Sequence, residues 1–398
     1  MRILVASHTY IVDLNCEKYR ALAQLAPDIE VTLVVPKRWN PGGVQNRIIE
    51  PEYKEEGSFR VVPVSNFSQN NQGLLSFGLD LVTLLREFRP HIIQVEQGSK
   101  ALAYAELITL NRLLGLKAKN LFFTWWNLPY DLKFPVSLLE SYNLKQTDGI
   151  VVGNQDGADI LRQRGYSGPM CIMPQLGVDE GIFAPQPQPE LRSQLGIAPT
   201  DFVIGFVGRF VPEKGLSTLF KALSAIKDLS WKTVLLGRGP LKDSLKQQAT
   251  ELGIDHRISW VESVPHDDVP HYINLMDTLV LPSETTYDFK TMTATGWKEQ
   301  FGHVLIEAMA CRVAVVGSDS GEIPHVIKDT GLTFPEGQSN HLADCLSKLI
   351  QQPELHKTLA QKGYERAMQQ YTNKALAKEL LGFYQTLSAN PPTPLSPT

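Results

Sequence analysis

Residues 202–215 read FVIGFVGRFVPEKG, and this stretch indicates the fold class. A continuous apolar run such as 204–207 is typical of a strand that is buried on both faces of a parallel sheet. The run ends at Gly208 and an expected helix begins after Gly215, so the stretch predicts a strand, a loop and a helix. Residues 313–316 repeat the apolar run and predict a second strand of the same kind.

Strand and helix signals alternate along the whole chain. The first series of predicted strands comprises 2–6, 31–35, 60–64, 91–95, 120–124 and 149–152. The second series comprises 202–207, 233–236, 258–260, 278–281 and 314–317. Amphipathic helices, for example 241–252 and 341–351, are expected between the strands. Such alternation predicts parallel sheets with helices on both faces, and hence an α/β fold.

The length and one Pro/Gln segment predict two domains. A chain of 398 residues exceeds the usual domain size of about 100–200 residues. The segment 184–189, APQPQP, is expected to be a stiff and exposed connector. We therefore expect one domain over 1–180, a second over 181–371 and a helix over 372–388. Residues 389–398, ANPPTPLSPT, should be disordered because they cannot bury apolar surface.

Charge and cysteine content argue against several classes of protein. Residues 1–178 carry 18 Lys and Arg against 17 Asp and Glu, and the remainder carries 20 against 25. Neither half therefore has the concentrated basic charge of a nucleic-acid binder. The spacing of the four cysteines favours reduced thiols in a cytoplasm over a zinc site or a disulfide framework. Neither a signal peptide nor a membrane span is expected, because the apolar runs are too short.

The segment 299–310, EQFGHVLIEAMA, combines a turn at Phe301-Gly302 with an apolar helix. Because the helix begins directly after Gly302, its free N–H groups and its dipole face the preceding loop and suit a pyrophosphate. Glu307 lies within the apolar run, where either a ribose diol or a buried structural ion pair would satisfy its carboxylate. Glu299 either contacts the neutral sugar that a diphosphate carries or stabilises the helix start.

The loop 208–215 supplies two cations. Arg209 offers a planar fork and Lys214 a point charge at the carboxyl end of a predicted parallel strand, which suits a diphosphate. Gly208 allows close approach of the backbone. The alternative is a solvated loop with no specific role. The loop matches neither a Walker A motif nor G-x-G-x-x-G, which argues against an NTPase or a dehydrogenase.

Together these motifs resemble the retaining family 4 glycosyltransferases, which have the GT-B fold. The family's glycine–arginine and lysine–glycine element corresponds to Gly208-Arg209 and Lys214-Gly215, and its paired glutamates correspond to Glu299 and Glu307. Lesser matches lie at 237–240, 281–283 and 320–324. The resemblance covers nearly the whole second half. It implies two Rossmann-like domains facing across a cleft, with the acceptor in the first, the donor in the second, and the C-terminal helix crossing back to the first.

The resemblance also implies roles for individual residues. Arg209 and Lys214 would hold the donor pyrophosphate, Glu307 the donor ribose and Glu299 the transferred sugar, so Glu299, Arg209 and Lys214 are the expected catalytic residues. Further donor contacts are expected from Gly208, Phe301, Gly302, His303 and Val304. The implied activity is metal-independent and cofactor-free transfer of a hexosyl group from a nucleotide diphosphate sugar with retention of configuration. The acceptor would be a saccharide or a lipid-linked saccharide, in polysaccharide or glycoconjugate biosynthesis.

The first half departs from the pattern of the family. The loop 7–13 lacks the glycine pair of many relatives, and the segment 123–129 lacks their histidine. A narrower bacterial branch, involved in polysaccharide assembly, is similar in the segments 94–97, 125–127 and 174–179. By this resemblance Glu96, Trp126 and Asn127 are acceptor-side residues, and His8 is a further candidate. Alternatively, Trp126 packs in the core or in a lid, and His8 is a loop histidine with no partner.

Several expectations remain open. The polar loop 284–298 either covers the donor as a lid or is a disordered insert. A lipid-linked acceptor would imply peripheral contact with the inner face of a membrane. The alternatives to a transferase are another GT-B enzyme, such as a nucleotide-sugar epimerase or a phosphorylase, and a non-catalytic binding subunit. A nicotinamide-linked oxidoreductase is disfavoured because no glycine-rich turn follows the first strand.

Overall fold

The computed structural model describes residues 1–41, 47–290 and 294–389. Contacts within the chain divide it into two compact units. Unit 1 comprises Met1–Gly177 together with the C-terminal segment from Asn373, and unit 2 comprises Val178–Thr372. The disorder predicted for 389–398 is wrong at its first residue, because Ala389 ends the last helix. Residues 390–398 lie outside the described residues.

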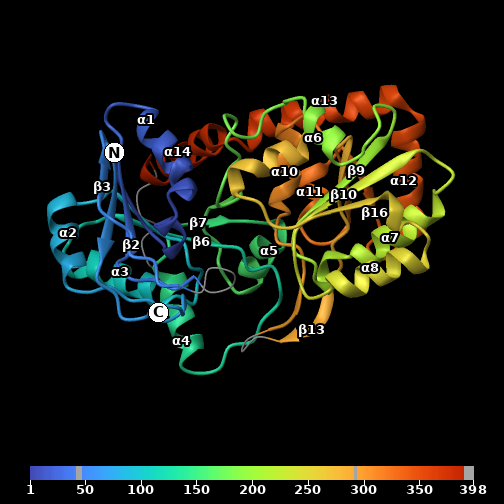
Figure 1. Cartoon of the computed structure of the whole chain (residues 1–398). Coiled ribbons are helices and arrows are strands. Elements are labelled where there is room, and N and C mark those ends of the chain that lie inside the picture. Colours follow the sequence, from blue (N-terminus) through green and yellow to red (C-terminus); the bar gives the residue numbers. More distant parts are fainter. Residues whose placement is uncertain (42–46, 291–293, 390–398) are drawn as a thin grey trace. The chain divides into compact units, whose positions relative to one another are not determined.

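Unit 1 is built on an eight-stranded sheet in the order β3-β4-β2-β1-β5-β6-β7-β8 (Figure 1). The strands are β1 (Arg2–Ala6), β2 (Glu30–Pro36), β3 (Lys54–Glu56), β4 (Phe59–Val64), β5 (Ile92–Val95), β6 (Lys119–Thr124), β7 (Gly149–Val152) and β8 (Met170–Ile172). Neighbours pair in parallel except β3 and β4, which are antiparallel. The expectation of purely parallel pairing is therefore wrong at this edge, where β3 is short and exposed.

The alternation of side chains along β1 assigns them to the two faces of the sheet. Leu4 and Ala6 pack in the core that α2 and α3 cover, whereas Ile3 and Val5 pack in the core that α1 and α14 cover. The helices of this unit are α1 (Glu17–Gln24), α2 (Asp80–Phe88), α3 (Leu102–Leu113), α4 (Val136–Lys145), α5 (Gln155–Gln163) and α14 (Asn373–Ala389), with 3-10 turns η1 (His8–Ile11) and η2 (Asp13–Cys16). The C-terminal helix α14 thus completes the core of unit 1.

Unit 2 is built on a six-stranded parallel sheet in the order β11-β10-β9-β12-β15-β16. The strands are β9 (Phe202–Val207), β10 (Trp231–Leu236), β11 (Ile258–Val261), β12 (Thr278–Leu281), β15 (Ala314–Ser318) and β16 (Leu332–Phe334). The helices are α6 (Pro189–Gln194), α7 (Leu216–Ala225), α8 (Lys242–Glu251), α9 (Val269–Ile273), α10 (His303–Ala310), α11 (Ile323–Ile327), α12 (Ser339–Gln351) and α13 (Pro353–Gln370). The 3-10 turns are η4 (Pro212–Lys214), η5 (Asp255–Arg257) and η6 (His266–Asp268).

The polar loop expected over 284–298 contains an antiparallel hairpin. Its strands are β13 (Thr286–Lys290) and β14 (Thr295–Trp297), and residues 291–293 lie outside the described residues. Tyr287 and Phe289 are exposed on β13, and they alternate with polar residues as a strand requires. The hairpin projects away from the six-stranded sheet (Figure 1). Its role as a lid stays a prediction.

Several helices of each unit are half-buried, with their apolar residues on the buried face. The helix α2 buries Leu81, Leu85 and Phe88 in this way, and α12 buries Leu342, Leu346 and Leu349. Within the described ranges, no helix has both the length and the apolar content that crossing a membrane requires.

Candidate functional site

The order of strands in unit 2 reverses between β9 and β12. The strands β10 and β11 lie on one side of this point, and β12, β15 and β16 lie on the other. In α/β sheets, ligands bind in the crevice outside the carboxyl ends of the strands at such a reversal. Gly208 and Arg209 follow β9 here, and Pro282 and Ser283 follow β12. The glycine–arginine motif of the sequence therefore lies at the position where this fold builds ligand sites.

A charge pair between Lys214 and Glu299 lies at this position. Lys214 Nζ donates a hydrogen bond of 2.5 Å to Glu299 Oε2, although the two residues are 85 positions apart in the sequence. Ser283 Oγ donates to the same oxygen at 2.7 Å. Lys214 Nζ also lies 5.0 Å from the centre of the Trp297 ring. Glu299 is 7% exposed, so the pair is held at the edge of the protein interior.

Two glycines allow the loops that carry this pair to approach one another. Gly215 has φ +64°, and a Cβ there would lie 1.8 Å from the carbonyl oxygen of Pro282. Gly321 has φ +58°, and a Cβ there would lie 1.8 Å from the carbonyl oxygen of Glu299. That carbonyl also accepts a hydrogen bond of 3.2 Å from the backbone of Glu322. The loops after β9, β12 and β15 are thus packed backbone to backbone around Lys214 and Glu299.

The helix α10 begins at His303, four residues after Glu299. Gly302 is its N-cap residue with φ +81°, and it has no side chain to cover the first-turn N–H groups. These groups and the helix dipole give the start of α10 a partial positive charge. Phe301 beneath the turn is 6% exposed and packs edge-to-face on Tyr371, with 5.7 Å between the ring centres. The turn that presents the helix start is therefore fixed by core packing.

Two further donor candidates have side-chain partners within unit 2. Glu307 Oε1 lies 3.1 Å from His303 Nδ1, one helical turn away, and its side chain is 14% exposed. Arg209 is 67% exposed at its side chain and reaches Glu213 Oε1 only at 3.5 Å. The structure thus brings Lys214, Glu299 and the α10 start (302–304) together, with Arg209 as a loosely held cation beside them.

Sequence reasoning gave no role to three residues that shape this site. Ser283 lies in a segment that was noted for its match to the family, but its bond to Glu299 depends on a contact across the sheet. Trp297 lay in the stretch interpreted as a polar loop. Gly321 lies within the segment 320–324, but its positive φ cannot be read from the sequence alone.

Glu96, which follows β5, is the centre of a buried hydrogen-bond network in unit 1. The side chain is 0% exposed. The groups around its carboxylate are the hydroxyls of Tyr10 and Tyr19, the amides of Gln94 at 2.7 Å and Gln175 at 2.8 Å, and the ammonium of Lys18 at 3.8 Å. Burial and the Glu96 charge hold the pKa of both phenols well above its ordinary value, so both remain donors. The Glu96 carboxylate is therefore enclosed by these groups, and its side chain exposes no surface to a ligand in this structure.

The other acceptor-side candidates also lie at the carboxyl ends of strands. The strand order of unit 1 reverses between β1 and β5, and His8 follows β1. His8 stacks on Trp39 with 4.9 Å between ring centres, and burial lowers its pKa to about 4, so the ring is neutral at pH 7. Trp126 follows β6, is half-buried and packs edge-to-face on Tyr130. The adjacent Asn127 is 5% exposed.

Two solved structures resemble the whole chain. Sucrose-phosphate synthase from Thermosynechococcus elongatus is 20% identical with a TM-score of 0.68, covering 98% of this chain and 99% of that one. Anabaena HepE, solved in complex with UDP and glucose, is 19% identical with a TM-score of 0.68, covering 97% and 100%. At these identities the likeness shows the fold. The chain has the GT-B fold, with two Rossmann-like domains.

A family model described as glycosyl transferases group 1 matches residues 187–366. The match includes the whole six-stranded sheet and every donor-side candidate. This part of the chain is therefore similar to the group 1 glycosyltransferases.

Two curated relatives are similar over part of their length. N-acetyl-alpha-D-glucosaminyl L-malate synthase of Bacillus anthracis is 26% identical over 213 residues, which are 53% of this chain and 51% of the relative. Alpha-D-kanosaminyltransferase of Streptomyces kanamyceticus is 26% identical over 202 residues, which are 50% and 49%. The chain spans about half the length of these relatives.

The close approach at Gly321 can be tested against a matched glycine. Gly337 has a similar φ of +73°, but a Cβ there would meet no atom within 4 Å. We predict that Gly337→Ala lowers the free energy of unfolding by about 1 kcal/mol, the cost of a left-handed residue with a Cβ. Gly321→Ala should lose about 3 kcal/mol or more, because it adds a backbone clash. Urea unfolding measures both, and equal losses would contradict the packing described.

The Glu96 network can be tested by removing its carboxylate. We predict that Glu96→Leu lowers the free energy of unfolding by about 3–5 kcal/mol, because it leaves the buried Lys18 ammonium and several donors without an acceptor. The exposed Glu87 is a control for the same substitution, and Glu87→Leu should change stability by about 0.5 kcal/mol at most. Lys18→Met in the Glu96→Leu background should recover part of the loss. A loss near that of the control would show that the network is not needed.

Proposed function

We propose that the chain is a glycosyltransferase that moves a hexosyl group from a nucleotide diphosphate sugar to a saccharide acceptor. The observation that carries this proposal is the Lys214–Glu299 pair beside the start of α10, at the strand reversal of unit 2. It combines positive charge for a leaving diphosphate with a carboxylate for a sugar.

The positive part of the site suits the diphosphate. The leaving group gains negative charge as the glycosidic bond breaks, and fixed positive groups stabilise that charge in the transition state. The start of α10 and Lys214 would supply this stabilisation, and the exposed Arg209 is free to swing onto the phosphates. Because protein cations neutralise the diphosphate in this scheme, we propose that transfer does not depend on a metal ion.

The carboxylates suit the neutral parts of the donor. Lys214 and Ser283 both donate to Oε2 of Glu299 and so fix its carboxylate at the strand reversal, where we expect it to meet a hydroxyl of the transferred sugar. Glu307 lies on the second turn of α10, beyond the phosphate position, where a ribose diol would meet it. The Anabaena protein was solved with UDP and glucose, which makes UDP-glucose the first donor to test.

The reaction is proposed to retain the anomeric configuration, as the resemblance to family 4 enzymes implies. Unit 1 would bind the acceptor, because its candidate residues also lie at a strand reversal. The acceptor would be a saccharide or a lipid-linked saccharide. The proton NMR coupling of the new anomeric centre in the product measures retention directly.

The donor roles can be tested by release of nucleoside diphosphate in the presence of acceptor. Thermal-shift screening of nucleotide sugars would first identify the donor, since a ligand that binds the folded state raises its stability. We predict that Lys214→Met and Glu299→Gln each lower kcat by about 100-fold or more, the usual effect of removing one such stabilising group. Arg209→Met should have a smaller effect, because its side chain is mostly exposed.

The matched controls are exposed residues of the same types in unit 2. Lys221→Met on α7 and Glu251→Gln on α8 should leave kcat within about twofold, as surface changes remote from a site usually do. If Lys214→Met and Glu299→Gln fold normally and also keep wild-type turnover, the proposed site is wrong. Donor binding without any transfer across a broad acceptor panel would instead favour a binding subunit.

A further inference from the structure

Lys100, in the loop after β5, is held in an unusual environment. Its Nζ lies 3.7 Å from the centre of the Tyr130 ring and 4.0 Å from the centre of the Trp126 ring. The Nζ atom is buried and has no hydrogen-bond partner among the described residues. Cation–π contacts hold an ammonium in place, but they do not satisfy its three N–H donors. A buried donor group without an acceptor costs free energy, so the site favours a ligand that supplies one.

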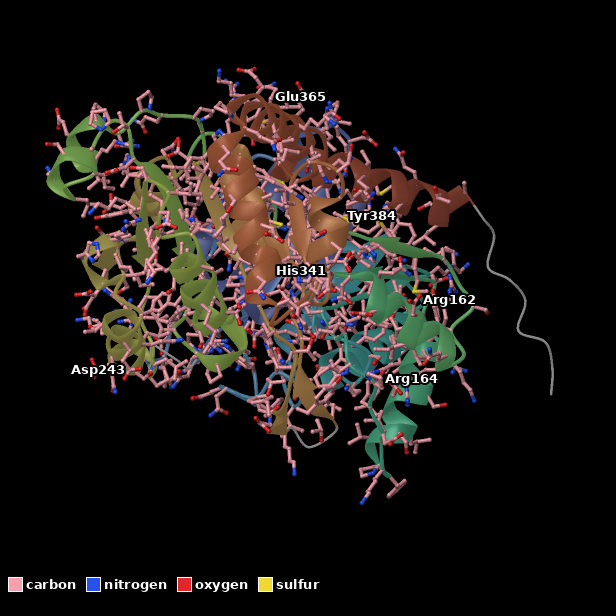
Figure 2. All side chains as sticks on the ribbon, turned by 90° about the vertical axis from the view of Figure 1, so that its right-hand side faces the viewer. Arg162, Arg164, Asp243, His341, Glu365 and Tyr384 are labelled. Carbon is pink, nitrogen blue, oxygen red and sulfur yellow. The ribbon has the colours of Figure 1, made fainter. Side chains whose placement is uncertain are left out.

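The carboxylate of Glu140, which acts electrostatically on Lys100, already accepts hydrogen bonds from other groups. Glu140 Oε1 accepts a hydrogen bond of 2.7 Å from Ser99 Oγ and another from the Tyr130 hydroxyl. Glu140 Oε2 accepts a hydrogen bond of 2.6 Å from Arg164 Nε. Figure 2 shows Arg164 just beyond the end of α5. Lys100, Arg164 and Glu140 therefore leave one positive charge in excess at this place.

The charge on Lys100 persists at neutral pH. Burial lowers the pKa of the ammonium, Glu140 raises it and Arg164 lowers it again, with a net value of about 8. The group is thus mostly protonated at pH 7. Burial raises the pKa of Tyr130 above its ordinary value, so this neighbour stays neutral. A buried charge of this kind needs a counter-ion. Among the described residues, the Glu140 carboxylate acts on Lys100, but it is already paired with Arg164.

Other polar atoms without partners lie at the same edge of the sheet. Both polar atoms of the Gln97 side-chain amide, three residues before Lys100, are buried and lack hydrogen-bond partners among the described residues. The same holds for Nδ1 of His8, which follows the neighbouring strand β1. The strand order of unit 1 reverses between these two strands. Neutral groups of this kind suit sugar hydroxyls, whereas Lys100 suits a negative charge.

We infer that the acceptor carries a carboxylate or a phosphate group, and that Lys100 binds this group at the carboxyl end of β5. The inference rests on the proposed function in that it takes unit 1 as the acceptor side. A carboxylate or phosphate oxygen accepts charge-assisted hydrogen bonds from the ammonium and cancels the excess charge. A neutral saccharide would form hydrogen bonds with the Gln97 amide and the His8 imidazole, but it would leave the charge of Lys100 unpaired. The substrate class is therefore an acidic saccharide or a sugar phosphate.

The inference is tested by equilibrium binding to the full chain with no donor present. The probes are glucuronic acid, glucose 6-phosphate and glucose, titrated by calorimetry or by ligand-observed NMR. We expect at least one of the two anionic probes to bind about tenfold or more tightly than glucose, as one charged hydrogen bond would give. Which of the two binds better distinguishes a carboxylate acceptor from a phosphate acceptor.

Substitutions locate the site of binding. Lys100→Met should remove the preference for the anionic probes, and Lys100→Arg should keep part of it because the charge remains. Lys145→Met, an exposed lysine of unit 1, should have no effect. Lys214→Met should also keep the preference, since it alters the proposed donor site of unit 2. Loss in Lys214→Met with retention in Lys100→Met would show that the anion binds in unit 2, and would overturn the inference.

A structural role for Lys100 gives a different result. If the ammonium only braces Trp126 and Tyr130, Lys100→Met should lower the midpoint of thermal unfolding and leave probe binding unchanged. We expect the midpoint to stay level or rise, because an unpartnered buried charge is removed. Equal binding of glucose and the anionic probes, or no binding of any probe at millimolar concentration, also overturns the inference. These binding experiments do not require turnover, so their outcome is independent of the outcome of the donor-site experiments.

Discussion

The ion pair between Lys214 and Glu299 is the contact on which the donor side of this molecule depends. It joins a loop after β9 to the turn before α10, and it does so at the point where the sheet reverses its strand order. The pair exists only because Gly215 and Gly321 let three backbone segments touch. Positive φ angles at these glycines would cost any other residue about 1–2 kcal/mol, even before the clash of a Cβ. The ion pair therefore depends on the backbone geometry at these two glycines.

Both units place polar side chains where the strand order of the sheet reverses, but the chemistry of these side chains differs. In each, the strands next to the reversal deliver side chains from two or three loops to one edge of the sheet. In unit 2 that edge combines a helix start with a lysine and a carboxylate, which is an arrangement for phosphates and a sugar. In unit 1 it combines neutral polar groups and aromatic rings with the Lys100 ammonium, which has no hydrogen-bond partner in the part of the chain that the structure describes. The buried Glu96 network beneath it joins β5 to α1, and Tyr384 of α14 (Figure 2) reaches it through Gln94.

Most of the parallel sheet was predictable from the sequence, because strands buried on both faces read as apolar runs. All the predicted strands coincide with observed strands to within two residues at each end. The strands β3, β8 and β16 were missed, since three residues carry too little pattern. The hairpin of β13 and β14 was interpreted as a loop from its polar composition, although its side chains alternate.

The candidate site was predictable in its residue types but not in its contacts. Glu299 and Lys214 were expected near a diphosphate, whereas their direct bond depends on tertiary packing that leaves no local signal. Glu96 was expected to face an acceptor, yet the tyrosines of η1 and α1 enclose it. Lys100 was not singled out, because a single lysine in a loop has no pattern until its neighbours are known.

The affinity for nucleoside diphosphates tests the central claim most directly. Calorimetric titration of the chain with diphosphates of each common base should give weaker binding for Lys214→Met, by about tenfold, since one charged contact is lost. Glu299→Gln should bind as tightly as the wild type or more tightly, because Lys214 is released from its partner and a negative charge is removed. Weaker binding in Glu299→Gln, or unchanged binding in Lys214→Met, would contradict the account.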